Sequence, residues 1–152
     1  MISDHQLKIK TDILTNKLNA GLFDEVITEA KVLLQKRGHQ IVYNILSIAY
    51  QSLGKYDFSV KIMEEALKKN PKNPYFLNNM GISKHKLEDY EEAESYFKKG
   101  LDIAPNYVNI LNNIANLKKD LNLIDEAIGF YEKSLQINEN LIETRLNLSM
   151  VY

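Results

Sequence analysis

The sequence predicts an all-α protein, an α-solenoid in which antiparallel helical hairpins stack side by side. Three observations predict this class. One residue pattern recurs at intervals of 34 residues. Within each copy the apolar residues follow the i, i+3, i+4, i+7 spacing of a helix. Turn residues or prolines separate the helices. A single hairpin cannot bury its own apolar face, so we expect neighbouring copies to cover one another.

The recurring pattern is clearest around residues 77 and 111, where Leu-Asn-Asn-Met-Gly is followed 34 positions later by Leu-Asn-Asn-Ile-Ala. The same shift leads back to Tyr-Asn-Ile-Leu-Ser at 43–47 and forward to Arg-Leu-Asn-Leu-Ser at 145–149. A more divergent copy at 21–26 matches 54–59 at a shift of 33. We therefore expect one array over residues 1–152, with repeats at about 7–39, 40–73, 74–107 and 108–141 and a partial repeat at 142–152.

The aligned columns alternate between small and large side chains. One column is small throughout and holds Ser47, Gly81, Ala115 and Ser149. The column beside it is large and apolar and holds Leu46, Met80, Ile114 and Leu148. Small residues opposite large ones let two helices cross closely and interdigitate. The columns therefore predict closely packed hairpins.

The helices follow from this pattern and from its interruptions. Tight turns are expected at 54–55, 88–89 and 122–123, and Pro71, Pro74 and Pro105 break the helices between repeats. The expected helices cover 5–19, 22–36, 40–53, 56–69, 74–87, 90–103, 108–121 and 124–137, and a further helix begins near residue 142.

Composition argues against several classes of function. The net charge is −1 and there are only two arginines, which disfavours a surface for nucleic acid or anionic membranes. The absence of cysteine excludes disulfides, zinc ribbons and thiol catalysis. Three scattered histidines predict neither a metal site nor a catalytic triad, and we expect no cofactor. The N-terminus does not read as a signal peptide and no apolar run is long enough to span a membrane, so we expect a cytoplasmic protein.

The period and the small and large columns resemble the tetratricopeptide repeat over the whole chain. This sequence departs from the family where Tyr43, Leu77 and Leu111 replace the usual tryptophan, and where Lys84 and Lys118 follow Tyr50 in an aromatic column. The resemblance implies a right-handed superhelix whose first helices line a concave face. The implied function is a scaffold for protein–protein interaction, and not an enzyme.

A more specific resemblance concerns the sequence of residues 111–116, Leu-Asn-Asn-Ile-Ala-Asn. It is most similar to the repeats of O-linked N-acetylglucosamine transferases and of bacterial arrays fused to glycosyl-, sulfo- or methyltransferase domains. This likeness implies that the chain is a substrate-presenting or regulatory arm of a longer protein. The asparagine-, lysine- and isoleucine-rich, arginine-poor usage is compatible with a low-GC bacterium.

Asparagines recur in the first helix of the predicted repeats. An amide both donates and accepts hydrogen bonds, so a row of amides can bracket the peptide units of an extended chain. The resemblance implies that Asn79, Asn113 and Asn147 grip the main chain of a partner. The predicted peptide-binding residues are Asn44, Asn78, Asn79, Asn109, Asn112, Asn113, Asn116 and Asn147. In the alternative, the amides bond to neighbouring helices and the module is structural or oligomerising.

Two further features lead to expectations. Some tetratricopeptide arrays bind a C-terminal carboxylate through lysine and arginine side chains on their first helices, an arrangement called a dicarboxylate clamp. The corresponding positions of this sequence carry no such cations, so we do not expect binding of this kind. Lys84, Lys86, Lys118 and Lys119 are expected to form a solvated basic edge. The last predicted helix carries Leu148 of a core column into a partial repeat, which predicts a fragment of a longer protein and an exposed apolar edge. We expect end-to-end self-association or swapping through that edge.

Overall fold

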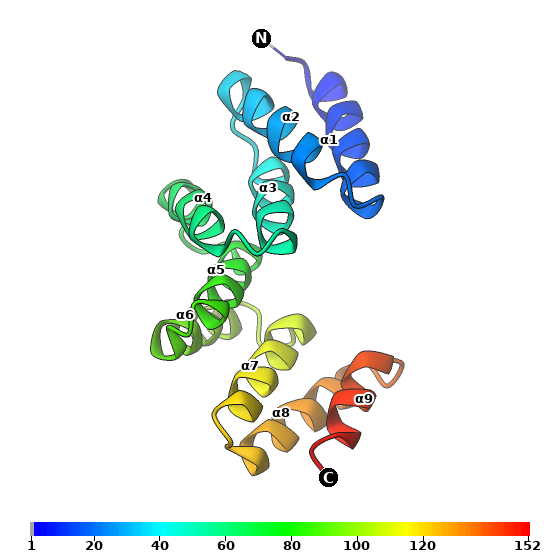
Figure 1. The fold of residues 1–152 in the computed structure, drawn as a ribbon, viewed down its shortest axis with the longest axis vertical. Coiled ribbons are helices and arrows are strands. Elements are labelled where there is room, and N and C mark those ends of the chain that lie inside the picture. The colour runs from blue at the N-terminus through cyan, green and yellow to red at the C-terminus, as the bar shows by residue number, and fades with distance from the viewer. Residues whose placement is uncertain (1) are drawn as a thin grey trace. The chain divides into compact units, whose positions relative to one another are not determined.

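The computed structural model describes residues 2–152, and within that range the chain folds into nine α-helices without any strand (Figure 1). All-α structure is therefore confirmed. Each of the first eight helices begins and ends within one residue of its predicted bounds, and the ninth begins at residue 142 as predicted. The helices are α1 (Asp4–Asn19), α2 (Phe23–Lys36), α3 (Gln40–Ser52), α4 (Tyr56–Lys69), α5 (Pro74–Lys86), α6 (Tyr90–Ile103), α7 (Val108–Asp120), α8 (Ile124–Ile137) and α9 (Ile142–Ser149). None of the helices in the described range is long and apolar enough to cross a membrane.

The helices form two compact units, residues 1–71 and 72–152. The division falls in the link between the predicted repeats 40–73 and 74–107. In the first unit, α3 packs against α1, α2 and α4. Its core is a continuous apolar cluster that includes Leu14, Val26, Val42 and Leu46. Where α3 meets α4, the buried hydroxyls of Ser47 and Ser59 share a hydrogen bond of 2.7 Å.

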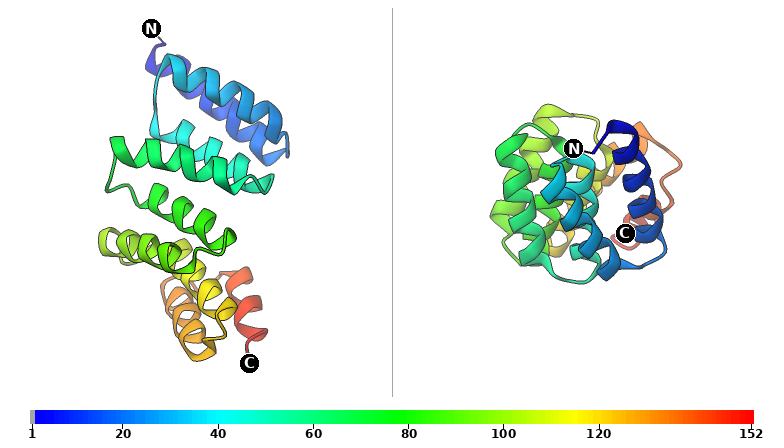
Figure 2. Two further views of the ribbon diagram at one scale, coloured as in Figure 1. Left: turned by 60° about the vertical axis from the view of Figure 1, so that its left-hand side comes forward. Right: turned by 90° about the horizontal axis from the view of Figure 1, so that it is seen from above.

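The second unit is built from the hairpins α5–α6 and α7–α8, followed by α9 (Figure 2). Helix α7 packs on both α5 and α6, and α9 packs on α8. One core cluster gathers Phe97, Ile110 and Ile114 between the two hairpins. A second cluster surrounds Ala127 and Tyr131, with Leu148 of α9 packed against it. Each hairpin is thus covered by the element that follows it in the chain.

The hairpin turns repeat as closely as the helices do. Each turn between the two helices of a hairpin contains one residue of positive φ: Gly21 (75°), Gly54 (68°), Glu88 (64°) and Asn122 (59°). A left-handed residue just beyond a helix lets the chain cap the last carbonyls and reverse direction. Glycine takes this conformation freely, whereas Glu88 and Asn122 take it against the preference of their Cβ atoms.

The small columns mark close helix crossings, as expected. A Cβ atom added to Gly81 would lie 2.4 Å from Cε1 of Phe97, which is itself fully buried. A Cβ atom on Gly100 would meet Cδ1 of Ile110 at the same distance. One repeat later the corresponding residues are Ser134 and Thr144, which are also buried. Within residues 2–152 the hydroxyls of these two residues have no hydrogen-bond partner.

Candidate functional site

Four asparagines form a stripe along α7, and we call Asn109, Asn112, Asn113 and Asn116 the amide stripe. Their i, i+3, i+4, i+7 spacing places them on one side of the helix. Asn109 is exposed and the other three are half-buried. The buried apolar residues of α7 lie between them in the sequence, so the stripe is a separate polar side of a helix whose remaining surface is in the core.

The stripe is tied to α5 by a direct amide–amide bond. Nδ2 of Asn113 donates to Oδ1 of Asn78 over 2.8 Å. Asn78 is only 6% exposed. This bond gives a buried carbonyl the partner that it needs, because an unmet buried acceptor costs about 1–3 kcal/mol. One predicted function of these amides, bonding between adjacent first helices, is therefore present in the structure.

At the other end of the stripe, Asn116 connects α7 to both α8 and α9. Its Oδ1 accepts a hydrogen bond from the hydroxyl of Tyr131 and a longer one, 3.4 Å, from Nδ2 of Asn147. The Tyr131 side chain is fully buried. Burial, together with the nearby charges of Asp120 and Glu143, raises the pKa of the Tyr131 phenol to about 12. Asn116 thus holds a neutral buried hydroxyl in place.

Asn112 breaks the regularity of the amide pairs. It occupies the position that Asn78 has one repeat earlier, but its buried Oδ1 accepts no hydrogen bond from any residue in the described range. The corresponding donor would be Asn147, which stands where Asn113 stands in the preceding repeat. Asn147 donates to Asn116 instead. One amide carbonyl in the stripe is consequently left with an unused acceptor.

The remaining predicted asparagines differ in accessibility. Asn79 of α5 is 5% exposed, and Asn44 lies half-buried on α3 in the first unit. Both take part in polar or aromatic contacts within the structure. Asn78 and Asn79 therefore offer little surface to a ligand. The accessible amides are Asn44 in the first unit and Asn109, Asn112, Asn113, Asn116 and Asn147 in the second. A peptide-binding role for them stays a prediction.

Two tyrosines lie beside the exposed end of the stripe. The rings of Tyr75 and Tyr107 meet edge to face with their centroids 5.3 Å apart, and Tyr75 is 57% exposed. They line an open depression of about 350 Å³ together with Pro74, Ala104, Pro105 and Asn106. Burial, more than the neighbouring Tyr75, raises the pKa of Tyr107, whereas a hydrogen bond with Asn109 lowers it. Sequence reasoning missed Tyr107, although Pro105 and the start of a helix at 108 place it at this edge.

Two of the four lysines expected to form a solvated edge, Lys84 and Lys118, are instead ion-paired. The Lys118 side chain is 9% exposed and lies 3.0 Å from carboxylate oxygens of both Glu94 and Glu126. Burial opposes its charge, but the hydrogen bonds to the two glutamates prevail and raise the pKa of Lys118. Lys84, in the same column, pairs with Asp89 and Glu92. Lysine fits this aromatic column because its alkyl chain packs inside while acidic residues on the second helices meet the charge.

A buried histidine connects α5 to the end of α7. His85 is 8% exposed, and its Nε2 lies 2.9 Å from Oδ2 of Asp120. Because a carboxylate only accepts, this contact requires a proton on Nε2. Burial lowers the pKa of His85 despite the opposing effect of Asp120. Across residues 2–152, His, Asp and Glu nowhere form a group of three that could hold a metal ion, so this pair joins two helices.

We expect the His85 contact to make stability depend on pH. Because the folded-state pKa lies below the usual 6.5, the unfolded chain takes up a proton first as the pH falls. The free energy of unfolding should therefore decrease between about pH 7.5 and pH 5.5. His85→Gln, which keeps a donor for Asp120, should flatten this decrease in urea titrations. Equal slopes in the wild type and His85→Gln would contradict the argument.

Stacked helical hairpins joined by side-chain contacts define a protein of the helical-repeat class. Two family models, both described as tetratricopeptide repeat, match residues 41–73 and 75–140, which together make up more than half of the chain. The chain belongs to the tetratricopeptide-repeat family, and its fold is an all-α tetratricopeptide solenoid. Repeats of this family are protein-interaction modules, and protein–protein interaction is the function of this chain. No curated protein sequence gave a significant match.

Several solved structures share this fold. A thermophilic tetratricopeptide-repeat protein from Thermus thermophilus, TTC0263, is 20% identical with a TM-score of 0.87, covering 93% of this chain and 79% of that protein. PilF of Pseudomonas aeruginosa is 18% identical with a TM-score of 0.82, covering 95% and 66%. The first tetratricopeptide domain of Spaghetti (RPAP3), bound to the HSP90 peptide SRMEEVD, is 21% identical with a TM-score of 0.67, covering 74% and 89%.

Proposed function

We propose that the second unit binds an extended peptide segment of a partner protein along the amide stripe of α7. The observation that supports this proposal is that hydrogen bonds within the structure fix the orientation of the amides and still leave some of their donors and acceptors unused. Asn113 and Asn116 are held by Asn78, Tyr131 and Asn147, yet both remain half-exposed. An amide side chain has two donor hydrogens and two acceptor lone pairs. The bonds within the structure leave part of this capacity unused on both residues.

The dimensions of the stripe suit a short extended segment. From Asn109 to Asn116 the stripe rises about 10 Å along α7. An extended chain covers that length with about three residues. Amides held in place lose little freedom when they bind, which favours affinity. Because amides recognise peptide groups, the stripe would read the backbone, and the depression beside Tyr75 and Tyr107 would accept one apolar or proline side chain.

The test begins with a library of random heptapeptides, selected on the immobilised chain and then synthesised with a fluorophore. Asn109→Ala and Asn112→Ala should each weaken the selected peptide about fivefold, the equivalent of one hydrogen bond. Gln136→Ala removes an exposed amide from α8 and should leave the affinity unchanged. N-methylation of the central peptide groups should also reduce binding. Unchanged affinity in every stripe variant, with normal helicity, would contradict the proposal.

A second candidate is a purely structural or oligomerising module. The Asn113–Asn78 and Asn147–Asn116 bonds favour it, because they show the amides joining successive first helices. The same variants separate the two functions. Loss of peptide affinity at constant stability supports the peptide site, whereas loss of stability without an effect on any selected peptide supports the structural role.

The finer likeness to the arrays of O-linked N-acetylglucosamine transferases and of bacterial transferase fusions stays a prediction, as do a bacterial source and a cytoplasmic location. Two observations support this prediction. Residues 111–116 have the sequence Leu-Asn-Asn-Ile-Ala-Asn, and three of them belong to the amide stripe on α7. In such a protein the peptide held by the stripe would be a substrate segment of the attached transferase. A fused transferase domain in the sequence of the parent gene would support this prediction, and its absence would contradict it.

A further inference from the structure

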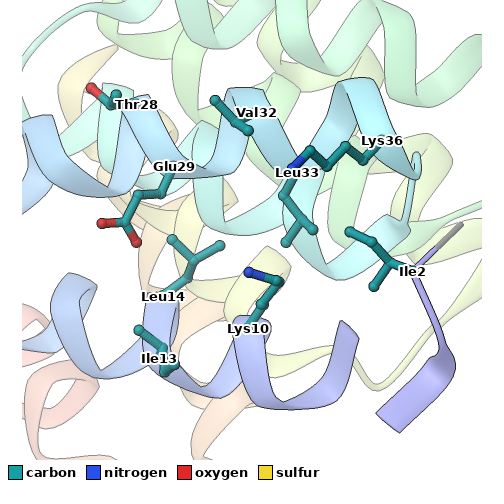
Figure 3. Close-up of a pocket in the computed structure, with 9 residues that line it drawn as sticks. All are labelled: Ile2, Lys10, Ile13, Leu14, Thr28, Glu29, Val32, Leu33 and Lys36. Atoms are coloured by element: carbon teal, nitrogen blue, oxygen red, sulfur yellow. The ribbon is translucent and has the colours of Figure 1, made fainter. Parts of the chain in front are cut away.

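A groove runs between α1 and α2 on the first hairpin (Figure 3). It has a volume of about 260 Å³ and is lined by apolar side chains from both helices, Ile13 and Leu14 from α1 and Val32 and Leu33 from α2. Ile13 and Val32 are 45% and 47% exposed. A groove of this kind between two helices accepts the apolar side of a third helix.

Two lysines give this groove a positive character. Lys10 from α1 and Lys36 from α2 both line it, and Figure 3 shows them on opposite helices with Leu33 between them. Within residues 2–152 neither lysine has an ion-pair partner, whereas the neighbouring Glu29 is already bound to Lys17. A helix that carries a carboxylate beside a row of apolar side chains would therefore match both the apolar lining and the positive charge of the groove.

Helix α9 carries such a ridge. Ile142, Leu146 and Met150 follow one another at intervals of four residues and are 74%, 59% and 68% exposed. Thr144, by contrast, is 1% exposed. Leu146 is two residues further on, about 200° around the helix, so the ridge faces away from the side of α9 that is buried. Glu143 lies next to it and is exposed. No residue in the described range 2–152 forms an ion pair with Glu143, so the ridge combines apolar side chains with an unpaired carboxylate.

We propose that α9 of one chain docks into the groove between α1 and α2 of a second copy. The arrangement repeats what the chain does internally, where α7 packs on the α5–α6 hairpin and α9 packs on α8. Glu143 would approach Lys10 or Lys36, and this ion pair would favour one orientation of α9 in the groove. Because ridge and groove are different surfaces, the contact is heterologous: each added copy leaves one ridge and one groove open. The contact is small, so we expect a Kd between about 10 µM and 1 mM.

Sedimentation velocity across this concentration range tests the proposal on the full chain. The wild type should form dimers and, at the upper end, larger species. Val32→Asp disables the groove and Leu146→Asp disables the ridge, and both residues are exposed enough for the fold to persist. Each variant alone should stay monomeric. Ile103→Asp changes an apolar residue of α6 that is 42% exposed and should associate like the wild type.

Mixing the two variants gives the decisive result. A Val32→Asp chain still has its ridge and a Leu146→Asp chain still has its groove, so an equimolar mixture should form one dimer and stop there. Glu143→Lys should weaken association, and adding Lys10→Glu and Lys36→Glu to the same chain should restore it, because every ridge then carries the opposite charge to every groove. A monomeric wild type, or a mixture that stays monomeric, would overturn the proposal. Association lost in Leu146→Asp but kept in Val32→Asp would also overturn it, because it would indicate a symmetric contact between two α9 helices.

Discussion

Gly81→Ala should lower the free energy of unfolding by up to about 2 kcal/mol, although alanine is the better helix former. The added Cβ would lie within 3.0 Å of three atoms of the Phe97 ring. Phe97 is fully buried, so its ring has no space into which to move. Overpacking of a core costs about 1–3 kcal/mol, and the gain in helix propensity offsets about 1 kcal/mol of it.

The matched control is Gly129→Ala on α8. Gly129 also lies inside a helix, but a Cβ atom there would meet nothing within 4 Å. The substitution should therefore raise the free energy of unfolding by up to about 1 kcal/mol. The difference between the two variants in urea titrations isolates the steric contact with Phe97. Phe97→Leu in the Gly81→Ala background should restore part of the loss, and equal stability of the two alanine variants would refute the close approach.

Asn116→Ala should destabilise the chain by about 2 kcal/mol because it leaves the buried hydroxyl of Tyr131 without its acceptor. Tyr131→Phe removes the hydroxyl as well as the need for a partner, and should cost only about 1 kcal/mol. The double variant should be about as stable as Tyr131→Phe alone. If Asn116→Ala has no effect on stability, the residue is available for a ligand and the structural role of the stripe is wrong.

The same pair has a signature in alkaline solution. The Tyr131 pKa is raised from 10.0 to about 12 by folding, so the unfolded chain loses its proton first as the pH rises. The stabilising contribution of the neutral phenol is complete below pH 10 and decreases between pH 10 and 12. The difference in unfolding free energy between the wild type and Tyr131→Phe should therefore shrink or reverse over that interval. A difference in unfolding free energy that stays constant from pH 10 to pH 12 would contradict the raised pKa of Tyr131.

Most of the fold follows from the sequence because its signals are local and repeated. The 34-residue period fixed the number of hairpins, and apolar spacing fixed each helix to within one residue. Even the turn at Glu88 was recoverable, since its aligned positions carry Gly54 and Asn122. The boundary between the two compact units was not predicted, because it depends on contacts between helices and not on the pattern within any one helix.

The candidate site was predictable only in part. The spacing of Asn109 to Asn116 predicted a common side of α7, and the structure has it. Bonding of the amides to neighbouring helices was one of the two predicted alternatives. Spacing alone does not say which partner an amide selects, so Asn78 as the acceptor for Asn113 and Tyr131 as the donor to Asn116 were not predicted. Likewise, the lysine column suggested a solvated edge because the glutamates that pair with Lys118 lie on α6 and α8, far from it in the sequence.

The junctions between repeats carry information about order. Gly100 and Ile110 occupy one junction, and the corresponding place one repeat later holds the buried pair Ser134 and Thr144. A serine opposite isoleucine would crowd the first junction, and a glycine opposite threonine would leave a void in the second. The two repeats are therefore not interchangeable, and a chain with its repeats in another order would have poorly packed junctions.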